Sequence, residues 1–351
     1  MSKKSNDIVA VDLFCGVGGL TRGLRRAGIS VALGVDVDPN CEYPFEWNNH
    51  AKFRKMSVSD VTAEELNTAW KGARYRLLAG CAPCQPFSTY SQAWDPSSDE
   101  RWPLLLQFGR LVKETRPDFV TMENVPKLQQ QEVFVQFKAT LESLGYGVSD
   151  AVVNCADYGV PQARNRLVLL AARGRQIALA PPRPGRNPRT VRQEIGKLPA
   201  LAAGGASSKD PLHRCSELSP LNLARIKVSV PGGSWKDWPD DLRTECHSRE
   251  SGRGYVSVYG RMNWDEPAPT VTTQFYGFGN GRFGHPEQER AISLREGAML
   301  QSFPKGYRFV KPGDEIKMKT LGRLIGNAVP VKLGEAIGRS IVRHVESLGR
   351  A

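Results

Sequence analysis

The chain has 351 residues, of which 40% are hydrophobic and 24% are charged, and this balance excludes a disordered or fibrous protein. Its length predicts either one large domain with an appendage or two modest domains. The sequence has no apolar run long enough for a membrane helix, and its short basic N-terminal tail leads directly into a strand-like segment. We therefore expect a soluble, cytoplasmic protein.

The charge balance points to a polyanionic partner. Lys and Arg number 48 against 36 Asp and Glu, which leaves a formal net charge of +12. A surplus of this size favours phosphate contacts, although a basic surface that only keeps the protein soluble is the alternative. The 7 cysteines are an odd number scattered over a long chain, which indicates free thiols and no disulfide framework.

The first 170 residues alternate short β-branched runs with amphipathic stretches. The pattern predicts strands over 8–14, 31–36, 76–80, 118–124 and 166–172, and helices over 20–28, 104–114 and 133–145. This alternation is typical of right-handed βαβ units, so we predict an α/β fold with a doubly wound, mostly parallel sheet. In such sheets, ligands bind at the carboxyl ends of the strands.

A second region begins after residue 173. Residues 173–199 carry seven Arg and Lys against one Glu and are rich in Pro, which indicates a basic linker. From there to about residue 290 the chain is rich in Gly, Trp, Tyr and Arg, and this composition predicts short strands and long loops. We expect a first domain over 1–175, completed by 291–351, and a smaller loop-rich domain with its linker over 176–290.

A glycine-rich turn follows the first predicted strand. Residues 15–19, Cys-Gly-Val-Gly-Gly, can let a ligand approach the backbone closely, and Asp36 ends the next strand, where a carboxylate can accept hydrogen bonds from a ribose. The spacing suits both NAD and S-adenosylmethionine. A turn that serves close packing alone is the structural alternative.

Two further strand ends deliver reactive side chains. Cys84 follows one predicted strand in a proline-stiffened loop, and Glu123 ends another. Together with the turn they form a motif series: DLFCGVGG (12–19), PCQPFS (83–88), ENV (123–125), QARNR (162–166), EPAPTVTT (266–273) and GNAVP (326–330). This series resembles that of the DNA (cytosine-5) methyltransferases over about residues 8–345.

The resemblance implies a Rossmann-like methyltransferase domain and a smaller target-recognition domain. It also implies transfer of a methyl group from S-adenosylmethionine to carbon 5 of a cytosine flipped out of duplex DNA. Cys84 would add to carbon 6, because a thiolate is the best side-chain nucleophile for that step, and Glu123 would protonate ring nitrogen 3. Arg164 and Arg166 would hold the cytosine oxygen and the catalytic carboxyl group.

The resemblance also implies which residues contact the cofactor, with S-adenosylhomocysteine as product and no metal. These residues are Phe14, Gly16, Gly18, Asp36, Val37, Asp60, Val61, Leu104, Asn327 and Val329. Asp36 would accept from the ribose, and Asp60 with Val61 would read the exocyclic amine of the adenine. Val37 departs from the family, which often has an aromatic residue there. The polar loop over 88–102 resembles a segment that closes over the extruded base.

Plainer interpretations stand beside these roles. Cys81 and Cys84 have redox or half-zinc spacing, but we expect Cys81 to be a small buried residue. A zinc site could draw on His213, Cys215, Cys246 and His247. Glu123 could serve only in an ion pair, and Arg164 and Arg166 only in a solvated basic edge.

The expected partner is double-stranded DNA, bound by a monomer. A cognate restriction endonuclease or other defence system is a further expected partner, by family analogy. Two alternatives remain: a tRNA cytosine-5 methyltransferase on the same fold, and a DNA-binding relative that has lost catalysis. The long segment between QARNR and EPAPTVTT favours a duplex-reading element over the tRNA enzyme.

Overall fold

The computed structural model describes residues 7–83, 103–182, 184–185, 187–249, 254 and 256–348. Contacts divide the chain into two compact units, of which the first comprises 1–158, 165–184 and 328–351 and the second 159–164 and 185–327. Cys84 and the polar loop over 88–102 lie outside the described residues. No helix in the described ranges combines the length and apolar character that a membrane span requires.

The first unit is built on one sheet of seven strands, in the order β3-β2-β1-β4-β5-β7-β6. The strands are β1 (Ile8–Leu13), β2 (Ser30–Asp36), β3 (Lys52–Lys55), β4 (Tyr75–Gly80), β5 (Phe119–Asn124), β6 (Tyr146–Asn154) and β7 (Asn165–Arg173). Strands β3, β2, β1, β4 and β5 are parallel, whereas β7 is antiparallel to both β5 and β6. The predicted doubly wound, mostly parallel sheet is confirmed.

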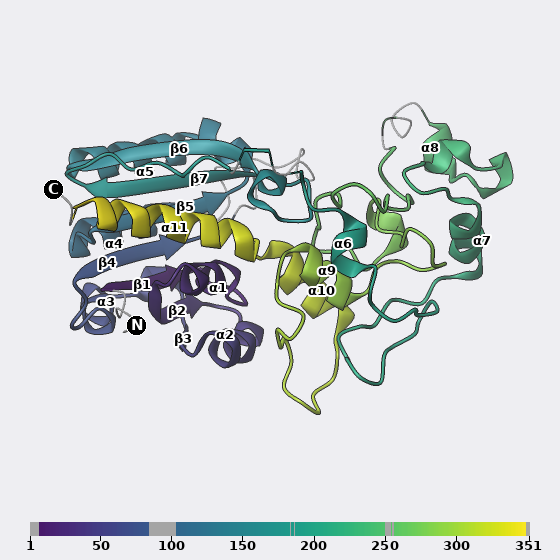
Figure 1. Ribbon diagram of the computed structural model, residues 1–351, viewed down its shortest axis with the longest axis horizontal. Helices are drawn as coiled ribbons and strands as arrows, with labels where there is room; N and C mark the ends of the chain where they lie inside the picture. The colour runs from purple at the N-terminus through teal and green to yellow at the C-terminus, as the bar shows by residue number, and fades with distance from the viewer. Residues whose placement is uncertain are drawn as a thin grey trace. The chain divides into compact units, whose positions relative to one another are not determined.

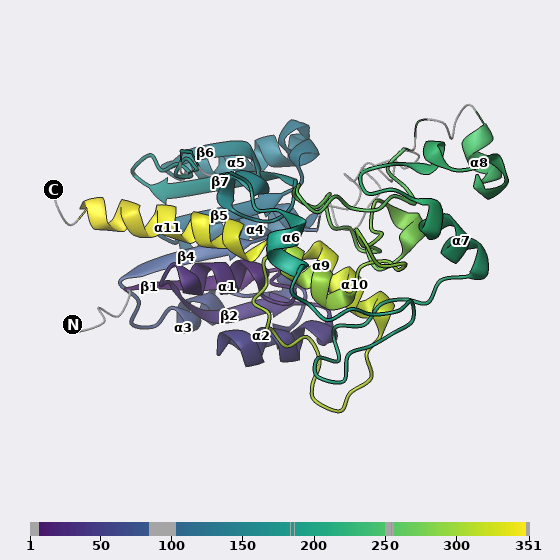
Figure 2. The same ribbon diagram turned by 45° about the vertical axis from the view of Figure 1, so that its right-hand side comes forward.

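Helices cover both faces of this sheet (Figure 1). Helices α1 (Gly19–Arg26) and α11 (Val331–Leu348) pack together on one face, next to α2 (Glu42–Asn49). Helices α3 (Ala63–Ala69), α4 (Pro103–Thr115) and α5 (Glu132–Ser143) pack in a row on the other face. The turned view in Figure 2 shows α11 running along the strands. Fully buried β-branched and aromatic side chains fill the space between the sheet and the helices, and this burial is the main stabilising force.

The second unit has little regular structure. Its helices are α6 (Val191–Ile195), α7 (Pro220–Val228), α8 (Glu245–Ser248), α9 (Leu294–Leu300) and α10 (Met318–Asn327). Where the sequence predicted short strands, the described part of this unit has isolated bridges, such as Gly284 with Ala291. A small aromatic core of Trp235, Trp238 and Phe278 lies within it.

The second unit extends further along the chain than the sequence pattern suggested. Residues 291–327 lie within it, and the chain returns to the first unit at residue 328. Helix α9 explains this difference, because it is buried along its whole length among loops of the second unit. The Arg295 guanidinium binds both carboxylate oxygens of Asp210, at 2.6 and 3.0 Å.

Candidate active site

The first candidate group lies where β1 passes into α1. Phe14 and Gly16 have φ values of 55° and 51°, and Gly18 has a φ of 85°. Gly16 and Gly18 occupy a left-handed backbone region that favours glycine, and a non-glycine residue such as Phe14 is found there mainly at functional sites. The Gly16 N–H donates to Asp36 Oδ2 at 2.9 Å, so the carboxylate at the end of β2 fixes the turn.

Asp36 uses both of its carboxylate oxygens on backbone amides. Its Oδ1 accepts from the Asp38 N–H at 3.0 Å, and burial raises the pKa of this carboxyl group. The neighbouring Val37 is 63% exposed, which is unusual for a large apolar side chain directly after a core strand. An exposed apolar surface beside a partly buried carboxylate suits a nucleoside, because the base can cover the apolar part while the ribose reaches the oxygen atoms.

Asp12 is a buried carboxyl group that the sequence analysis did not single out. Its Oδ2 accepts from Thr21 Oγ1 at 2.6 Å, whereas no donor in the described part of the chain reaches its Oδ1. Burial raises the pKa of Asp12 to about 7. A lone polar residue in a β-branched strand would have been the signal for it, and burial of a carboxyl oxygen without a donor makes this group costly to ionise.

The Asp60–Val61 pair lies in a short turn that follows β3. Asp60 is exposed, whereas Val61 is buried in the core beneath it. Arg110 of α4 donates to three carbonyl groups of this turn, and Leu104 lies at the start of the same helix with a partly buried side chain. Of the remaining predicted cofactor residues, Asn327 is exposed at the end of α10 in the second unit, and Val329 is buried in the first unit.

Glu123 ends β5 and is only 3% exposed. Its Oε1 lies 3.0 Å from Arg166 Nε, and its Oε2 lies 3.0 Å from Cys81 Sγ, with the thiol as donor. Arg166 belongs to β7, which pairs with β5, and this pairing brings the two side chains together. Cys81 is partly exposed, not buried as the sequence suggested.

Asn124 ties the end of β5 to the neighbouring strand end. Its Nδ2 donates to the Ala82 carbonyl at 2.9 Å, two residues before Cys84. Because β4 and β5 are adjacent and parallel, their carboxyl ends meet at one edge of the sheet. The segment that leads into Cys84 is therefore fixed beside the carboxyl group of Glu123.

Arg164 and Arg166 have different partners. Arg164 is buried, and its guanidinium donates to the carbonyl groups of Val271 at 2.8 Å and Gly326 at 3.1 Å, all within the second unit. Gln162 accepts from the Val271 N–H at 2.8 Å. The QARNR segment therefore links the EPAPTVTT and GNAVP motifs to each other, while its last arginine meets Glu123.

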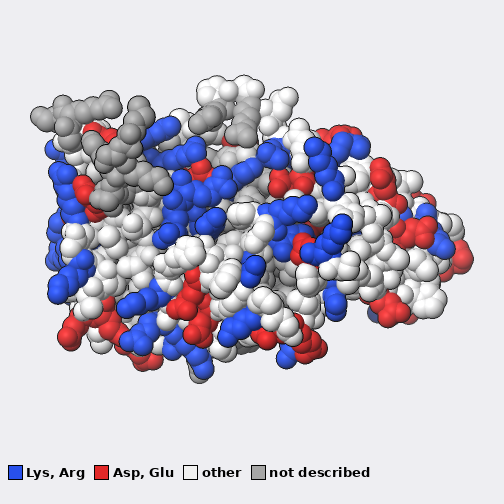
Figure 3. Space-filling model, turned by 60° about the horizontal axis from the view of Figure 1, so that its bottom comes forward, with Lys and Arg blue, Asp and Glu red and all other residues white. Residues whose placement is uncertain are grey.

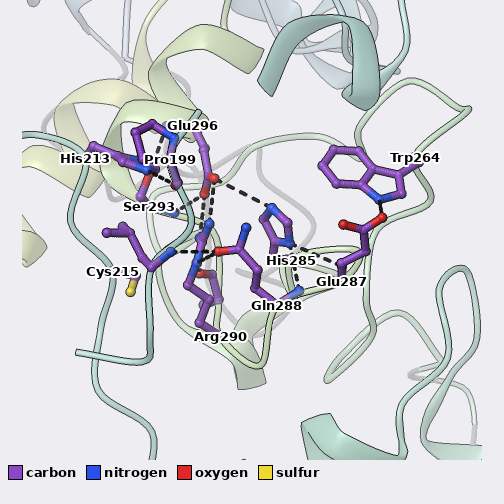
Figure 4. A network of polar contacts seen from close by, with 12 residues as sticks. Pro199, His213, Cys215, Trp264, His285, Glu287, Gln288, Arg290, Ser293 and Glu296 are labelled. Atoms are coloured by element: carbon purple, nitrogen blue, oxygen red, sulfur yellow. Dashed lines mark hydrogen bonds and ion pairs between the residues drawn. The ribbon is translucent and has the colours of Figure 1, made fainter. Parts of the chain in front are cut away.

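Three of the residues considered for a zinc site, His213, Cys215 and His247, have other partners, and Figure 4 shows those of His213. His213 bonds Ser293 Oγ and the Pro199 carbonyl, at 2.9 and 2.8 Å, and the Cys215 thiol donates to the Ala202 carbonyl. His247 stacks on Trp235, with ring centroids 4.2 Å apart. Within the described ranges, no group of three or more His, Cys, Asp or Glu could hold a metal ion.

Figure 4 also shows a buried ion pair in the second unit. The Arg290 guanidinium donates to both Glu296 oxygens, at 2.7 and 2.8 Å, and Glu296 also accepts from the Ser293 N–H. The carboxylate therefore has a hydrogen-bond donor for each oxygen, which offsets much of the cost of burying its charge. Burial lowers the pKa of the adjacent His285 to about 4 and keeps its ring neutral at pH 7.

The comparisons with known proteins agree on one family. The model of the family described as C-5 cytosine-specific DNA methylase matches residues 8–343. Type II methylase M.HgiDII of Herpetosiphon aurantiacus is 52% identical over 342 residues, covering 96% of each chain. Type II methyltransferase M.Eco47II of Escherichia coli is 31% identical over 362 residues, covering 99% of this chain and 82% of its own.

The fold has close counterparts among solved structures. A putative DNA modification methyltransferase encoded within an E. coli prophage has a TM-score of 0.74 at 22% sequence identity, covering 97% of this chain and 99% of its own. At that identity, the likeness supports the methyltransferase fold independently of the family match.

Proposed function

Because this chain belongs to the C-5 cytosine-specific DNA methylase family, we propose that Cys84 and Glu123 carry the methylation of cytosine within a specific duplex sequence. The chain is a DNA cytosine-5 methyltransferase, as the resemblance in its motifs predicted. Its family acts on DNA and uses S-adenosylmethionine. The single observation that carries the residue roles is the placement of Glu123 between Arg166 and Cys81, at the sheet edge that leads into Cys84.

Cys84 makes the cytosine ring reactive. Its thiolate forms a bond to carbon 6, and Glu123 delivers a proton to ring nitrogen 3, so that carbon 5 becomes nucleophilic. When bound, S-adenosylmethionine supplies an electrophilic methyl group to that carbon. Loss of the carbon 5 proton to a base, departure of the Cys84 sulfur as a thiolate and return of the nitrogen 3 proton to Glu123 then restore the aromatic ring and free the enzyme.

Arg166 orients the acid that performs the protonation. Its Nε holds Glu123 Oε1, and the rest of its guanidinium can donate to the cytosine oxygen. The Arg164 guanidinium already donates to two carbonyl groups. A contact with the base or its phosphate would have to form while those two bonds are kept.

The cofactor fits the edge formed by β1, β2 and the Val58–Val61 turn. The glycines of the Gly16–Gly18 turn let the backbone approach the ligand closely, Asp36 accepts from the ribose, and Val37 covers the adenine. Asp60 accepts from the adenine amine. Phe14, Leu104, Asn327 and Val329 complete the contacts, as the family motifs imply.

The second unit supplies target recognition. Its arginines and aromatic residues suit phosphate binding and base-edge contacts, and the cytosine must leave the duplex before carbon 5 can be reached. We propose that the enzyme works as a cytoplasmic monomer and protects host DNA from a cognate endonuclease. The relatives named as Type II methylases support this restriction-modification role.

The experiment compares duplex DNA and tRNA as methyl acceptors, with Cys84→Ala as the test variant. The wild-type enzyme should label DNA and convert cytosine to 5-methylcytosine, and Cys84→Ala should lose turnover by at least about a thousandfold while still binding DNA. Cys215→Ala removes a thiol in the second unit and serves as the control. A duplex containing 5-fluorocytosine should become joined to the wild-type protein at residue 84.

Two results would contradict these roles. Near wild-type turnover of Cys84→Ala would remove the covalent mechanism. Strong labelling of tRNA with silent DNA would instead favour the tRNA enzyme on the same fold.

A further inference from the structure

We propose that Arg110 is a positioning residue that presets the turn Val58–Val61 for recognition of the adenine. It acts through Asp60, so this inference rests on the proposed role of that carboxylate. Arg110 belongs to none of the motifs that identify the family. It lies in the middle of α4, on the face of the sheet opposite α1 and α11.

Arg110 binds this turn through a single nitrogen atom that contacts three of its carbonyl oxygens. One terminal nitrogen, Nη2, lies 3.4 Å from the Val58 carbonyl oxygen, 3.3 Å from that of Ser59 and 2.9 Å from that of Val61. The three acceptors are carbonyl groups on both sides of Asp60, two before it and one after it. A shift of the turn would therefore break the whole set of bonds.

The rest of the guanidinium is held by α4 itself. Its Nε donates to Gln107 Oε1 at 2.6 Å, and its Nη1 donates to the two carboxylate oxygens of Glu114 at 3.1 and 2.9 Å. These partners fix the plane of the group, so that Nη2 points at the turn. Lysine has a single terminal nitrogen and cannot make both sets of bonds at once.

The turn also has supports close to it in the sequence. Val58 and Val61 are anchored in the core, the Asp60 N–H donates to the Ser57 carbonyl at 3.0 Å, and Ser57 Oγ accepts from the Ser59 N–H at 3.2 Å. Arg110 adds bonds from α4 to carbonyl groups on both sides of Asp60. The segment Val58–Asp60 is a single 3-10 turn, which is too short to be rigid by itself. With Arg110 in place, the exposed Asp60 is held in one orientation before the ligand arrives, and this preorganisation lowers the entropic cost of binding.

Comparing the binding of two ligands distinguishes this positioning role from a general effect of Arg110 on folding. The first is S-adenosylhomocysteine, and the second is its analogue with hydrogen in place of the amine at carbon 6 of the purine. Only the first can donate to Asp60, so the wild-type protein should prefer it. Dissociation constants from isothermal titration calorimetry give the ratio, and ligand-free thermal unfolding shows whether each variant is folded.

Arg110→Met keeps the length of the side chain but removes the donors. It should weaken binding of S-adenosylhomocysteine about tenfold, the factor that corresponds to one well-placed hydrogen bond, and weaken binding of the analogue much less. The ratio of the dissociation constants of the two ligands should therefore fall toward one. Arg110→Lys should lie between Arg110→Met and the wild type. Lys113→Gln removes a positive charge from the same helix at an exposed position and should keep the wild-type ratio.

Equal weakening of both ligands in Arg110→Met would overturn the proposal, because Arg110 would then support the fold alone. An Arg110→Met variant that bound S-adenosylhomocysteine as tightly as the wild type would overturn the proposal as well. Asp60→Ala tests the premise separately and should abolish the preference. If Asp60→Ala kept the preference, the proposed adenine contact would be wrong, whatever Arg110 does.

Discussion

The carboxyl group of Glu123 has a different partner on each oxygen: the Arg166 guanidinium forms an ion pair with Oε1, and the Cys81 thiol donates a hydrogen bond to Oε2. The two partners come from β7 and from the end of β4, and together they fix the plane of the carboxyl group. An acid must be aligned with the atom that it protonates, so the thiol of Cys81 should contribute to the rate through Glu123.

Cys81→Ala and Cys81→Ser test this contribution. Cys81→Ala should lower the single-turnover rate about tenfold, because the hydrogen bond to Glu123 Oε2 is lost, with little change in DNA affinity. Cys81→Ser keeps a donor in a side chain of similar size and should stay within about threefold of the wild type. Equal losses in both variants would mean that the packing of the sulfur matters and its hydrogen bond does not.

Asp12 makes the stability of the protein depend on pH. Burial raises the pKa of its carboxyl group from 3.8 to about 7, so the folded protein retains a proton that the unfolded chain releases at lower pH. The stabilising effect of that proton is complete below pH 3.8 and is lost as the pH rises toward 7. Above that value, the buried negative charge is a constant cost.

Asp12→Asn should remove this cost while keeping an acceptor for Thr21. Relative to the wild type, the variant should gain stability as the pH rises from about 4 to 8, up to about 4 kcal/mol. Urea denaturation of both proteins at several pH values measures the difference. Thr21→Val deletes the hydrogen bond that lowers the pKa of Asp12. The loss of stability with rising pH should therefore occur at higher pH in this variant. A difference that is constant with pH would contradict the assignment to Asp12.

At the scale of elements, α1 and α11 approach closely because glycine lies between them. A Cβ atom on Gly23 would lie 2.5 Å from the Val331 carbonyl oxygen and from backbone atoms of Gly334 and Glu335. Backbone atoms cannot move aside as a flexible side chain can. The contact also joins the C-terminal helix to the helix that follows the Gly16–Gly18 turn.

Gly23→Ala should therefore lower the free energy of unfolding by about 1–3 kcal/mol, even though alanine favours helix. It should also weaken binding of S-adenosylhomocysteine, because α1 carries the turn. Gly109→Ala is the matched control, since its Cβ would lie 3.5 Å from Phe137, an ordinary contact, within α4. The control should be neutral or slightly stabilising in urea denaturation. If Gly23→Ala were as stable as Gly109→Ala, the helices would not need this close approach.

The sequence predicted the elements whose pattern is local. Strands β1, β2, β4, β5 and β7 are runs of β-branched and apolar residues, and they lie within a residue or two of the predicted ranges. Strand β3 was missed because it is short and carries exposed charged residues, and β6 was missed because Ser149 and Asp150 interrupt its apolar run. The motifs that carry Gly16, Cys84 and Glu123 lie at the ends of predicted strands, and the remaining motifs were found through their resemblance to the family. Arg110 acts through contacts with a turn distant in the sequence, which no spacing reveals.

The second unit was the least predictable part, for a related reason. Its loops are held by buried arginines that donate to distant carbonyl groups, in place of a sheet. Arg261, for example, donates to the carbonyl groups of Ile226, His285 and Gln288, at distances from 2.8 to 3.2 Å. Arg261 and Arg290 are buried and structural, so the DNA contacts proposed for this unit fall to its exposed arginines.

At the scale of the whole molecule, the +12 charge is the property that concerns DNA most directly. Buried arginines are part of that total, yet Lys and Arg side chains also spread over the surface, with Asp and Glu among them on the face drawn in Figure 3. Contacts between such side chains and phosphates release condensed counterions from DNA, so affinity depends on the salt concentration. The slope of that dependence counts the phosphates that the protein neutralises.

The affinity for a duplex should fall steeply between about 50 and 200 mM salt, by about a thousandfold or more if six or more phosphates are neutralised. Fluorescence anisotropy with a labelled duplex, measured at several salt concentrations, gives the slope. Cys84→Ala should show the wild-type slope, because a nucleophile that attacks the base makes no phosphate contact. A flat response would mean that the surplus charge does not face the duplex, and the second unit would then have to bind DNA through base contacts alone.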